Sequence, residues 1–209
     1  MQVTLEISPV VSVVSASWNC ATGQSQCCGH VTGVLYLMAH YKQRGLKSIP
    51  RDVAKTVLTE AMREAVANEP VAVETYGKVK EGNVNIYPCG IVISPRAAWM
   101  AASPDRKVLD PRSNPPFGPL EVKCPDLRNK DLHDLPYLSR KDNGQLALKI
   151  TSNYYHQIQM QLAVTGLKWC DLFVWSERQH HLERIDFCPE SWQSVKDKAD
   201  KFYFDYILS

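Results

Sequence analysis

The chain has 209 residues, 44% hydrophobic and 22% charged, which is typical of a globular protein with one domain and at most a small appendage. Its net charge is only +2, so any contact with nucleic acid has to come from local basic patches. No apolar run approaches the roughly 18 residues of a membrane span, and the first residues lack the basic and long apolar regions of a secretory signal.

The seven cysteines are odd in number and have no framework spacing, which favours reduced thiols over disulfides. We therefore expect an intracellular, reducing compartment, and the nucleus if the chain is eukaryotic. Four cysteines fall in or beside strand-like runs and are expected to be buried rather than to bind metal: Cys89, Cys124, Cys170 and Cys188.

The first 46 residues are predicted to form a small module. Alternating polar and apolar residues indicate one or two strands in 1–15, and apolar residues at helical spacing indicate a helix over 31–44 that ends at Gly45. The sequence KSIP at 47–50 indicates a linker, so we place a boundary between residues 1–46 and residues 51–209.

The larger part is predicted to contain both helices and strands. Helices are expected at 51–68, 71–76, 153–165 and 189–208, and strands at 86–94, 97–102, 120–124, 146–150, 170–175 and 184–187. Residues 78–85, 110–118 and 126–144 are expected to be loops. We expect Pro70 to break or kink the first helix, and Ser152 and Gly166 to cap the third.

Two acids and a lysine are candidates for an active site: Asp105, Glu121 and Lys123. Asp105 ends Ser-Pro-Asp, and Glu121 and Lys123 alternate with apolar residues in LEVKCP at 120–125, so they share one face of the predicted strand. Pro119 and Pro125 are expected to bracket that strand. Such carboxylates suit Mg²⁺-assisted cleavage of a phosphodiester. The alternative is a surface Glu–Lys pair on an edge strand, with Asp105 as a turn residue.

The helix predicted at 153–165 carries three glutamines within five residues. Gln157 and Gln161 are four residues apart and therefore lie on one face. A neutral amide there can bond a metal-bound water or a phosphate oxygen without competing for the metal. The alternative is a polar face exposed to solvent.

Four segments in order resemble the YqaJ-like viral recombinase family, the family of phage lambda exonuclease within the PD-(D/E)XK nucleases. They are ANEPVAVETY at 67–76, ASPD at 102–105, LEVKCP at 120–125 and YYHQIQMQLAVTG at 154–166. The resemblance covers about residues 55–205. It implies an α/β (α+β) fold with a restriction-endonuclease-like core, in which helices flank a central mixed sheet.

The same resemblance implies Mg²⁺-dependent hydrolysis of DNA from an end, typically 5′ to 3′ on double-stranded DNA, in recombination or repair. Mn²⁺ would be able to replace Mg²⁺. Asp105, Glu121 and the main-chain carbonyl of Val122 would hold the metal, helped by Glu69 directly or through a water. Lys123 would position the attacking water, and Gln157 would lie behind the site. The family also suggests a homotrimer and a single-strand annealing partner.

The family usually has glycine after the motif aspartate, where this chain has Arg106. An arginine in a turn that needs positive φ would be strained, or it would add a phosphate contact. Four residues are candidates for binding DNA: Arg106, Lys107, Tyr155 and Gln161.

The segment CGH at 28–30 before a helix resembles the second half of a SWIM-type zinc finger. The first ligand of that pattern would fall at Trp18, which cannot bind zinc. Structural zinc needs four ligands, so the candidate set is Cys20, Cys27, Cys28 and His30. The alternative is a degenerate finger whose helix still packs.

The sequence therefore predicts a metal-dependent DNA exonuclease. Two alternatives stay open. One is a catalytically inactive DNA-binding or adaptor protein that retains the nuclease fold, and the other is an endonuclease on that fold.

Overall fold

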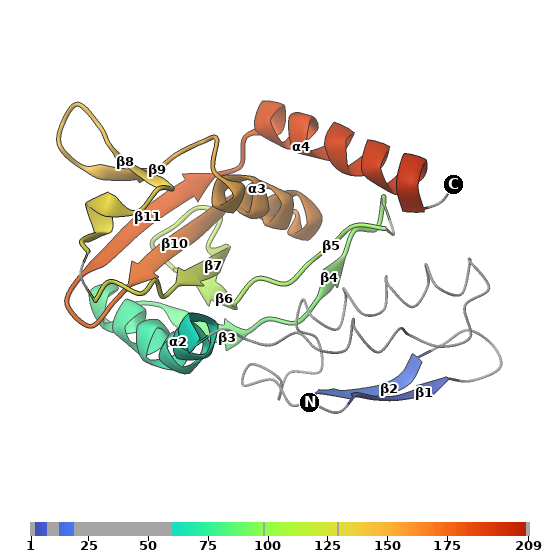
Figure 1. Ribbon diagram of the computed structural model, residues 1–209, viewed down its shortest axis with the longest axis horizontal. Helices are drawn as coiled ribbons and strands as arrows, with labels where there is room; N and C mark the ends of the chain where they lie inside the picture. The colour runs from blue at the N-terminus through green and yellow to red at the C-terminus, as the bar shows by residue number, and fades with distance from the viewer. Residues whose placement is uncertain (1–2, 8–12, 19–59, 98, 129, 208–209) are drawn as a thin grey trace.

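The computed structural model describes residues 3–7, 13–18, 60–97, 99–128 and 130–207 (Figure 1). Near the N-terminus, β1 (Val3–Ile7) pairs antiparallel with β2 (Val13–Trp18), which accounts for two strands where one or two were expected. The four candidate zinc ligands, the helix expected at 31–44 and the proposed boundary at 47–50 lie outside the described residues.

A five-stranded mixed sheet forms the centre of the described fold, in the order β11-β10-β7-β6-β3. Its strands are β3 (Asn85–Pro88), β6 (Arg106–Leu109), β7 (Phe117–Lys123), β10 (Trp169–Trp175) and β11 (His180–Asp186). β7 and β10 run parallel, and the other neighbours are antiparallel. Parallel strands need a long crossover, and residues 124–168 supply it.

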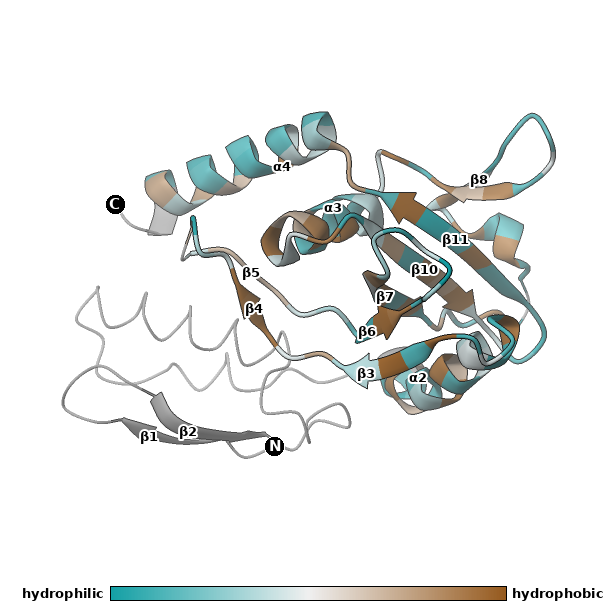
Figure 2. Cartoon of the chain, turned by 180° about the vertical axis from the view of Figure 1, so that it is seen from behind, coloured by the Kyte–Doolittle hydropathy of each residue, from teal (hydrophilic) through white to brown (hydrophobic). Residues whose placement is uncertain are grey.

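The two central strands are covered on both faces, so their side chains alternate between two packing layers. From β10, Trp169, Phe173 and Trp175 pack with α2 (Glu60–Val79), while Cys170, Leu172 and Val174 pack toward α3 (Asn153–Thr165). Brown, hydrophobic segments lie on these strands in Figure 2, and also on β4, β11 and α3. The predicted mixed sheet flanked by helices is therefore confirmed, because strands buried on both faces need a helix on each.

Of the two outcomes expected at Pro70, a break was wrong, because α2 continues through it to Val79, and a kink stays a prediction. The proline ring is exposed, and the next two turns are held by Ala72 and Tyr76, which are fully buried against the sheet. Packing on that side compensates for the hydrogen bond that proline cannot donate. The separate helix expected at 71–76 is the second half of α2.

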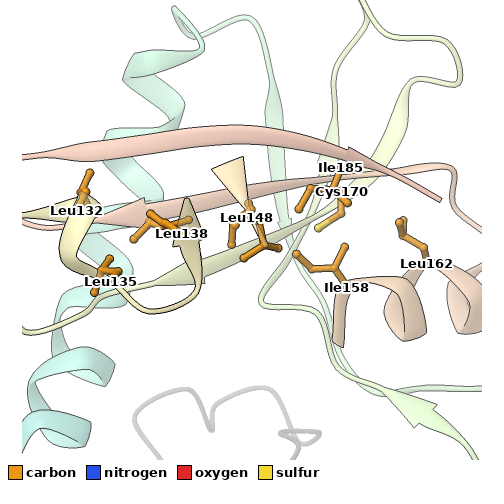
Figure 3. Packing of buried hydrophobic residues seen from close by; sticks show 10 residues of the cluster. Leu132, Leu135, Leu138, Leu148, Ile158, Leu162, Cys170 and Ile185 are labelled. Carbon is orange, nitrogen blue, oxygen red and sulfur yellow. The ribbon is translucent and has the colours of Figure 1, made fainter. Parts of the chain in front are cut away.

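The loop expected at 126–144 also contains regular structure. The short 3₁₀ helix η1 (Leu132–Asp134) is followed by β8 (Leu138–Arg140), which pairs with β9 (Leu146–Leu148). The segment 126–148 has little periodicity. It nevertheless contributes Leu132, Leu135, Leu138 and Leu148 to the core cluster shown in Figure 3. Contacts made at long range, rather than local pattern, therefore order it.

Two further elements differ from the expected strands near Asp105. The strand expected over 86–94 is divided between β3 and β4 (Val92–Ile93), and the run 97–102 is strand only in β5 (Ala101–Ala102), which pairs with β4. Pro119 lies inside β7 rather than at its end and faces Lys107 of β6. The final helix is α4 (Pro189–Phe202), continued by the π-helical turn η2 (Tyr203–Ile207).

Ser152 and Gly166 cap α3 as predicted. The Ser152 side chain accepts a hydrogen bond from the amide of Tyr155, and Gly166 has a φ of 72°. Ser152 sets where α3 begins and Gly166 sets where it ends. The two caps therefore help to determine which residues of α3 face β7. None of the described helices is both long and apolar enough to cross a membrane.

Candidate active site

Glu121 lies in the middle of β7 and is only 1% exposed. Leu120 and Val122 on either side of it pack with α2, so the alternation of the strand directs Glu121 toward α3. The alternative of an exposed Glu–Lys pair on an edge strand was therefore wrong, because β7 is paired on both sides.

Three donors surround the Glu121 carboxylate. Gln157 Nε2 donates to Oε1 and Gln161 Nε2 to Oε2, each at 2.7 Å, and the Lys123 ammonium donates to Oε1. The two glutamines are one turn apart on α3, as their spacing predicted. A buried carboxylate needs such partners because burial without them is costly.

Asp105 lies just before β6 and beside Glu121. Its Oδ2 accepts a hydrogen bond of 2.7 Å from the main-chain amide of Val122. Burial, and then the negative charge of Glu121, raise the pKa of Asp105 to about 8. The two carboxyls therefore repel each other, and the cluster is one that a divalent cation would relieve.

Lys123 completes this group. Burial by itself lowers the pKa of its ammonium, but the charges of Glu121 and Asp105 outweigh that effect and the pKa is raised. The ammonium also lies 4.8 Å from the centre of the Tyr154 ring. Lys123 is therefore held as a cation beside the two acids.

Glu69 reaches the same region from α2, where it interacts with Arg106. Arg106 Nη1 lies 2.9 Å from Glu69 Oε1 and also donates to the main-chain carbonyl of Asp105 at 2.5 Å. Glu69 Oε1 is buried and has no hydrogen bond of good geometry, so the pair is held by charge. Arg106 begins β6, and Glu81 is the only described non-glycine residue with positive φ, so the strain expected at Arg106 is absent.

The three predicted acids do not converge as closely as expected. Among the described residues, the only three metal-binding side chains whose ligand atoms all lie within 4.8 Å of one another are Asp131, His133 and Asp134. Glu69, Asp105 and Glu121 do not meet this condition, and Glu69 instead pairs with Arg106. The role of Glu69 as a metal ligand, directly or through a water, therefore stays a prediction.

Asp105 and Glu121 nevertheless fit a hard divalent cation. They offer carboxylate oxygens, the ligands that Mg²⁺ and Mn²⁺ prefer. The ammonium of Lys123 pairs with Glu121. The exposed trio at residues 131–134 is already used in local bonds, with Asp134 accepting from the Asp131 amide and Asp131 from Gln179.

The four candidate DNA-binding residues have different environments. Gln161 is 3% exposed and bonds Glu121, and Arg106 is engaged by Glu69, so neither is a free contact for DNA. Tyr155 packs partly buried against the core. Lys107 is exposed, with its ammonium 4.5 Å from the Phe117 ring centre, and its contact with DNA stays a prediction.

Two contacts of the site were not predicted. The ring of Tyr154 covers Lys123, and Arg106 links Glu69 to the backbone of Asp105. The tyrosines beside the glutamines were a visible signal for the first. The second had no local signal, because Glu69 and Arg106 are 37 positions apart and meet only when α2 packs on the sheet.

A cavity of about 430 Å³ lies between α2, the segment that follows β7 and the turn between β10 and β11. Its lining includes Asn68, Arg128, Trp175 and Arg178. Asn68 precedes Glu69 in the chain, and Pro125, also in the lining, follows Lys123 by two residues. Asp105, Glu121 and Lys123 do not line it.

A family model described as the YqaJ-like viral recombinase domain matches residues 26–168. The chain belongs to this family. The match includes the segments that carry Glu69, Asp105, Glu121, Lys123 and Gln157. No curated protein matches the chain.

Solved structures show the same fold for this YqaJ-like domain. The chain is similar to LHK-Exo in complex with dAMP, with 23% identity, a TM-score of 0.58, and coverage of 84% of this chain and 77% of that one. It is also similar to the alkaline exonuclease LHK-Exo from Laribacter hongkongensis, with 21% identity, a TM-score of 0.57, and coverage of 85% and 80%. At this identity the likeness establishes the fold alone.

Proposed function

We propose that the chain is a metal-dependent deoxyribonuclease that degrades DNA from an end, 5′ to 3′ on double-stranded DNA, in recombination or repair. The observation that carries the proposal is the group formed by Glu121 and Lys123 of β7 and by Asp105, which lies just before the adjacent strand β6. Paired carboxylates beside an ammonium suit hydrolysis of a phosphodiester. Membership of the YqaJ-like family supports this reaction class.

The metal would be Mg²⁺, which Mn²⁺ is able to replace, held by Asp105, Glu121 and the main-chain carbonyl of Val122. When bound, it would lower the pKa of a ligated water and neutralise charge on the phosphate. Gln157 and Gln161 hold the Glu121 carboxylate in one orientation, so fewer degrees of freedom are lost when it binds a cation. Lys123 would orient the attacking water and stabilise negative charge on the phosphate.

DNA as the substrate is supported by the family and by similarity of fold to an exonuclease. The cavity lined by Asn68, Pro125 and Arg128 is a candidate place for part of the nucleic acid. Lys107 is a candidate phosphate contact on the adjoining strand. The homotrimer and the annealing partner remain predictions from the family. A zinc site at Cys20, Cys27, Cys28 and His30 is likewise a prediction.

One observation favours a second function. Arg106 places a positive charge against Glu69, an acid expected to help bind the metal. A chain with a weakened metal site would act as a DNA-binding or adaptor protein that keeps the nuclease fold. An endonuclease on the same fold is a third candidate, which closed circular DNA would identify.

The test is digestion of linear duplex DNA with Mg²⁺ or Mn²⁺, with EDTA as the blank and circular duplex in parallel. Because Glu121 is buried against three donors, Glu121→Gln is preferable to alanine, and Lys123→Ala is its companion. Each is expected to lower the rate by at least about 100-fold. Glu190→Gln, an exposed substitution on α4, should cleave like the parent. Equal cleavage by all these proteins would refute the assignment, and cutting of circles would indicate the endonuclease.

A further inference from the structure

Arg106 lies where two parts of the metal-binding group meet. Its guanidinium contacts the Glu69 carboxylate of α2 and the main-chain carbonyl of Asp105, which are respectively a charged and a neutral oxygen. The Arg106 side chain is 26% exposed and that of Glu69 is 13% exposed, so water screens the pair weakly. A fixed cation therefore already faces Glu69.

The charges of the group allow for one divalent cation. Three carboxylates, on Glu69, Asp105 and Glu121, face two cations, Lys123 and Arg106. The excess is one negative charge when all are ionised. A second divalent ion at Glu69 Oε1 would lie close to a guanidinium nitrogen only 2.9 Å from that oxygen, and like charges so near repel strongly.

We propose that Arg106 takes the place of a cation at Glu69 and limits the site to one divalent ion, held by Asp105, Glu121 and the Val122 carbonyl. This inference rests on the proposed metal site. Glu69 then acts as the partner of Arg106 and not as a ligand of the ion.

Lys107 offers a matched control for Arg106. It is the next residue on β6, it carries the same charge, and its exposed side chain lies over Phe117 on the other side of the strand. Replacing either residue with glutamine removes one positive charge from the chain. Only Arg106→Gln removes a charge from Glu69.

The experiment counts bound Mn²⁺ on the whole protein by the loss of the free-ion EPR signal during titration. We expect one ion for the parent and for Lys107→Gln, and a second, weaker ion for Arg106→Gln that is lost again in Glu69→Gln/Arg106→Gln. Thermal melting verifies that each variant is folded. Two ions in the parent, or one in a folded Arg106→Gln, would overturn the inference and leave the nuclease assignment standing.

A single substitution covers the case in which Arg106→Gln does not fold. If Glu69 is not a ligand, Glu69→Gln should keep one Mn²⁺ with its affinity within about 3-fold of the parent. A loss of 10-fold or more would show that Glu69 binds the ion directly and overturn the inference. No binding by the parent at any concentration up to millimolar would reject both this inference and the metal-dependent part of the proposed function.

Discussion

Among single residues, two carboxyls of the candidate site destabilise each other. Asp105 is half-buried beside Glu121, and its pKa is raised to about 8 by burial and then by that neighbouring charge. When a carboxyl has a higher pKa in the folded state than in the unfolded state, the free energy of unfolding falls as the pH rises from the unfolded pKa, near 4, to the folded one. Such strain is common where function, rather than stability, sets the residue.

Asp105→Asn is therefore expected to stabilise the protein in EDTA, and increasingly so from pH 5 to pH 9. The gain at pH 9 should be at least about 1 kcal/mol, or roughly 2–4 °C in Tm for a chain of this size. Thermal melts at several pH values measure it. Asp142→Asn, an exposed acid with the same charge change, should show no such trend. If Asp105→Asn and the parent had identical pH dependence, burial of a charged Asp105 beside Glu121 would not be the source of the instability.

At the scale of elements, the position of β7 against β10 depends on one glycine. Gly118 lies in β7, and a Cβ there would come within 2.3 Å of the Trp169 ring of β10. That ring cannot move freely, because Arg184 stacks on it at 3.6 Å and its Nε1 donates to the Pro115 carbonyl at 2.7 Å. β7 also carries Glu121, so the contact between Gly118 and Trp169 also helps to set the position of Glu121.

Gly118→Ala is expected to lower the free energy of unfolding by about 1–3 kcal/mol, because the added methyl group overpacks a fixed ring. Urea denaturation measures this loss. Gly77→Ala is the matched substitution, since its Cβ would be an ordinary 3.6 Å from Ile86 and alanine suits α2 better than glycine. It should leave stability unchanged or raise it by up to about 1 kcal/mol. Equal effects of the two would show that the Trp169 contact is not what Gly118 serves.

At the scale of the whole molecule, a second charged group joins elements that are far apart in the sequence. Asp171 of β10 is 1% exposed and accepts from Tyr76 of α2 at 2.8 Å and from Arg184 of β11 at 2.7 and 2.9 Å. Lys80 and Arg184 also pair with Asp110, at 3.0 and 3.3 Å. Asp110 and Asp171 each pair with cations of the chain, so this group is structural. Asp105, by contrast, lies beside the negative charge of Glu121.

Arg184→Ala is expected to lower the free energy of unfolding by about 3 kcal/mol, since it leaves a buried carboxylate short of charge. Chemical denaturation at pH 7 provides the measurement. Arg112→Ala removes a more exposed partner, 3.8 Å from Asp110, and should change stability by less than about 1 kcal/mol. If Arg184→Ala were as mild as Arg112→Ala, Asp171 would not need its guanidinium.

The loss of stability at acid pH tests the same group of charged residues. Burial alone raises the pKa of Asp110, but bonds from Lys80 and the Arg112 amide outweigh it and lower the pKa to about 2. A depressed carboxyl pKa stabilises the fold fully above about pH 4 and progressively less as pH falls toward 2. Asp110→Asn should therefore flatten the loss of stability over that range, as followed by circular dichroism. If Asp110→Asn lost stability at acid pH as steeply as the parent, Asp110 would be excluded as the source of that loss.

The family, the mixed sheet with flanking helices and the caps of α3 could all be predicted from the sequence, as could Asp105, Glu121, Lys123 and Gln157 as candidates. These follow from short-range period, capping residues and ordered motifs. The sequence did not predict that α2 continues through Pro70, that η1 and β8 form, or that Gln161 bonds Glu121. The pairing of Glu69 with Arg106 and the burial of Glu121 became visible only in the folded chain. Burial and charge pairing depend on which elements pack together, and no local pattern contains that information.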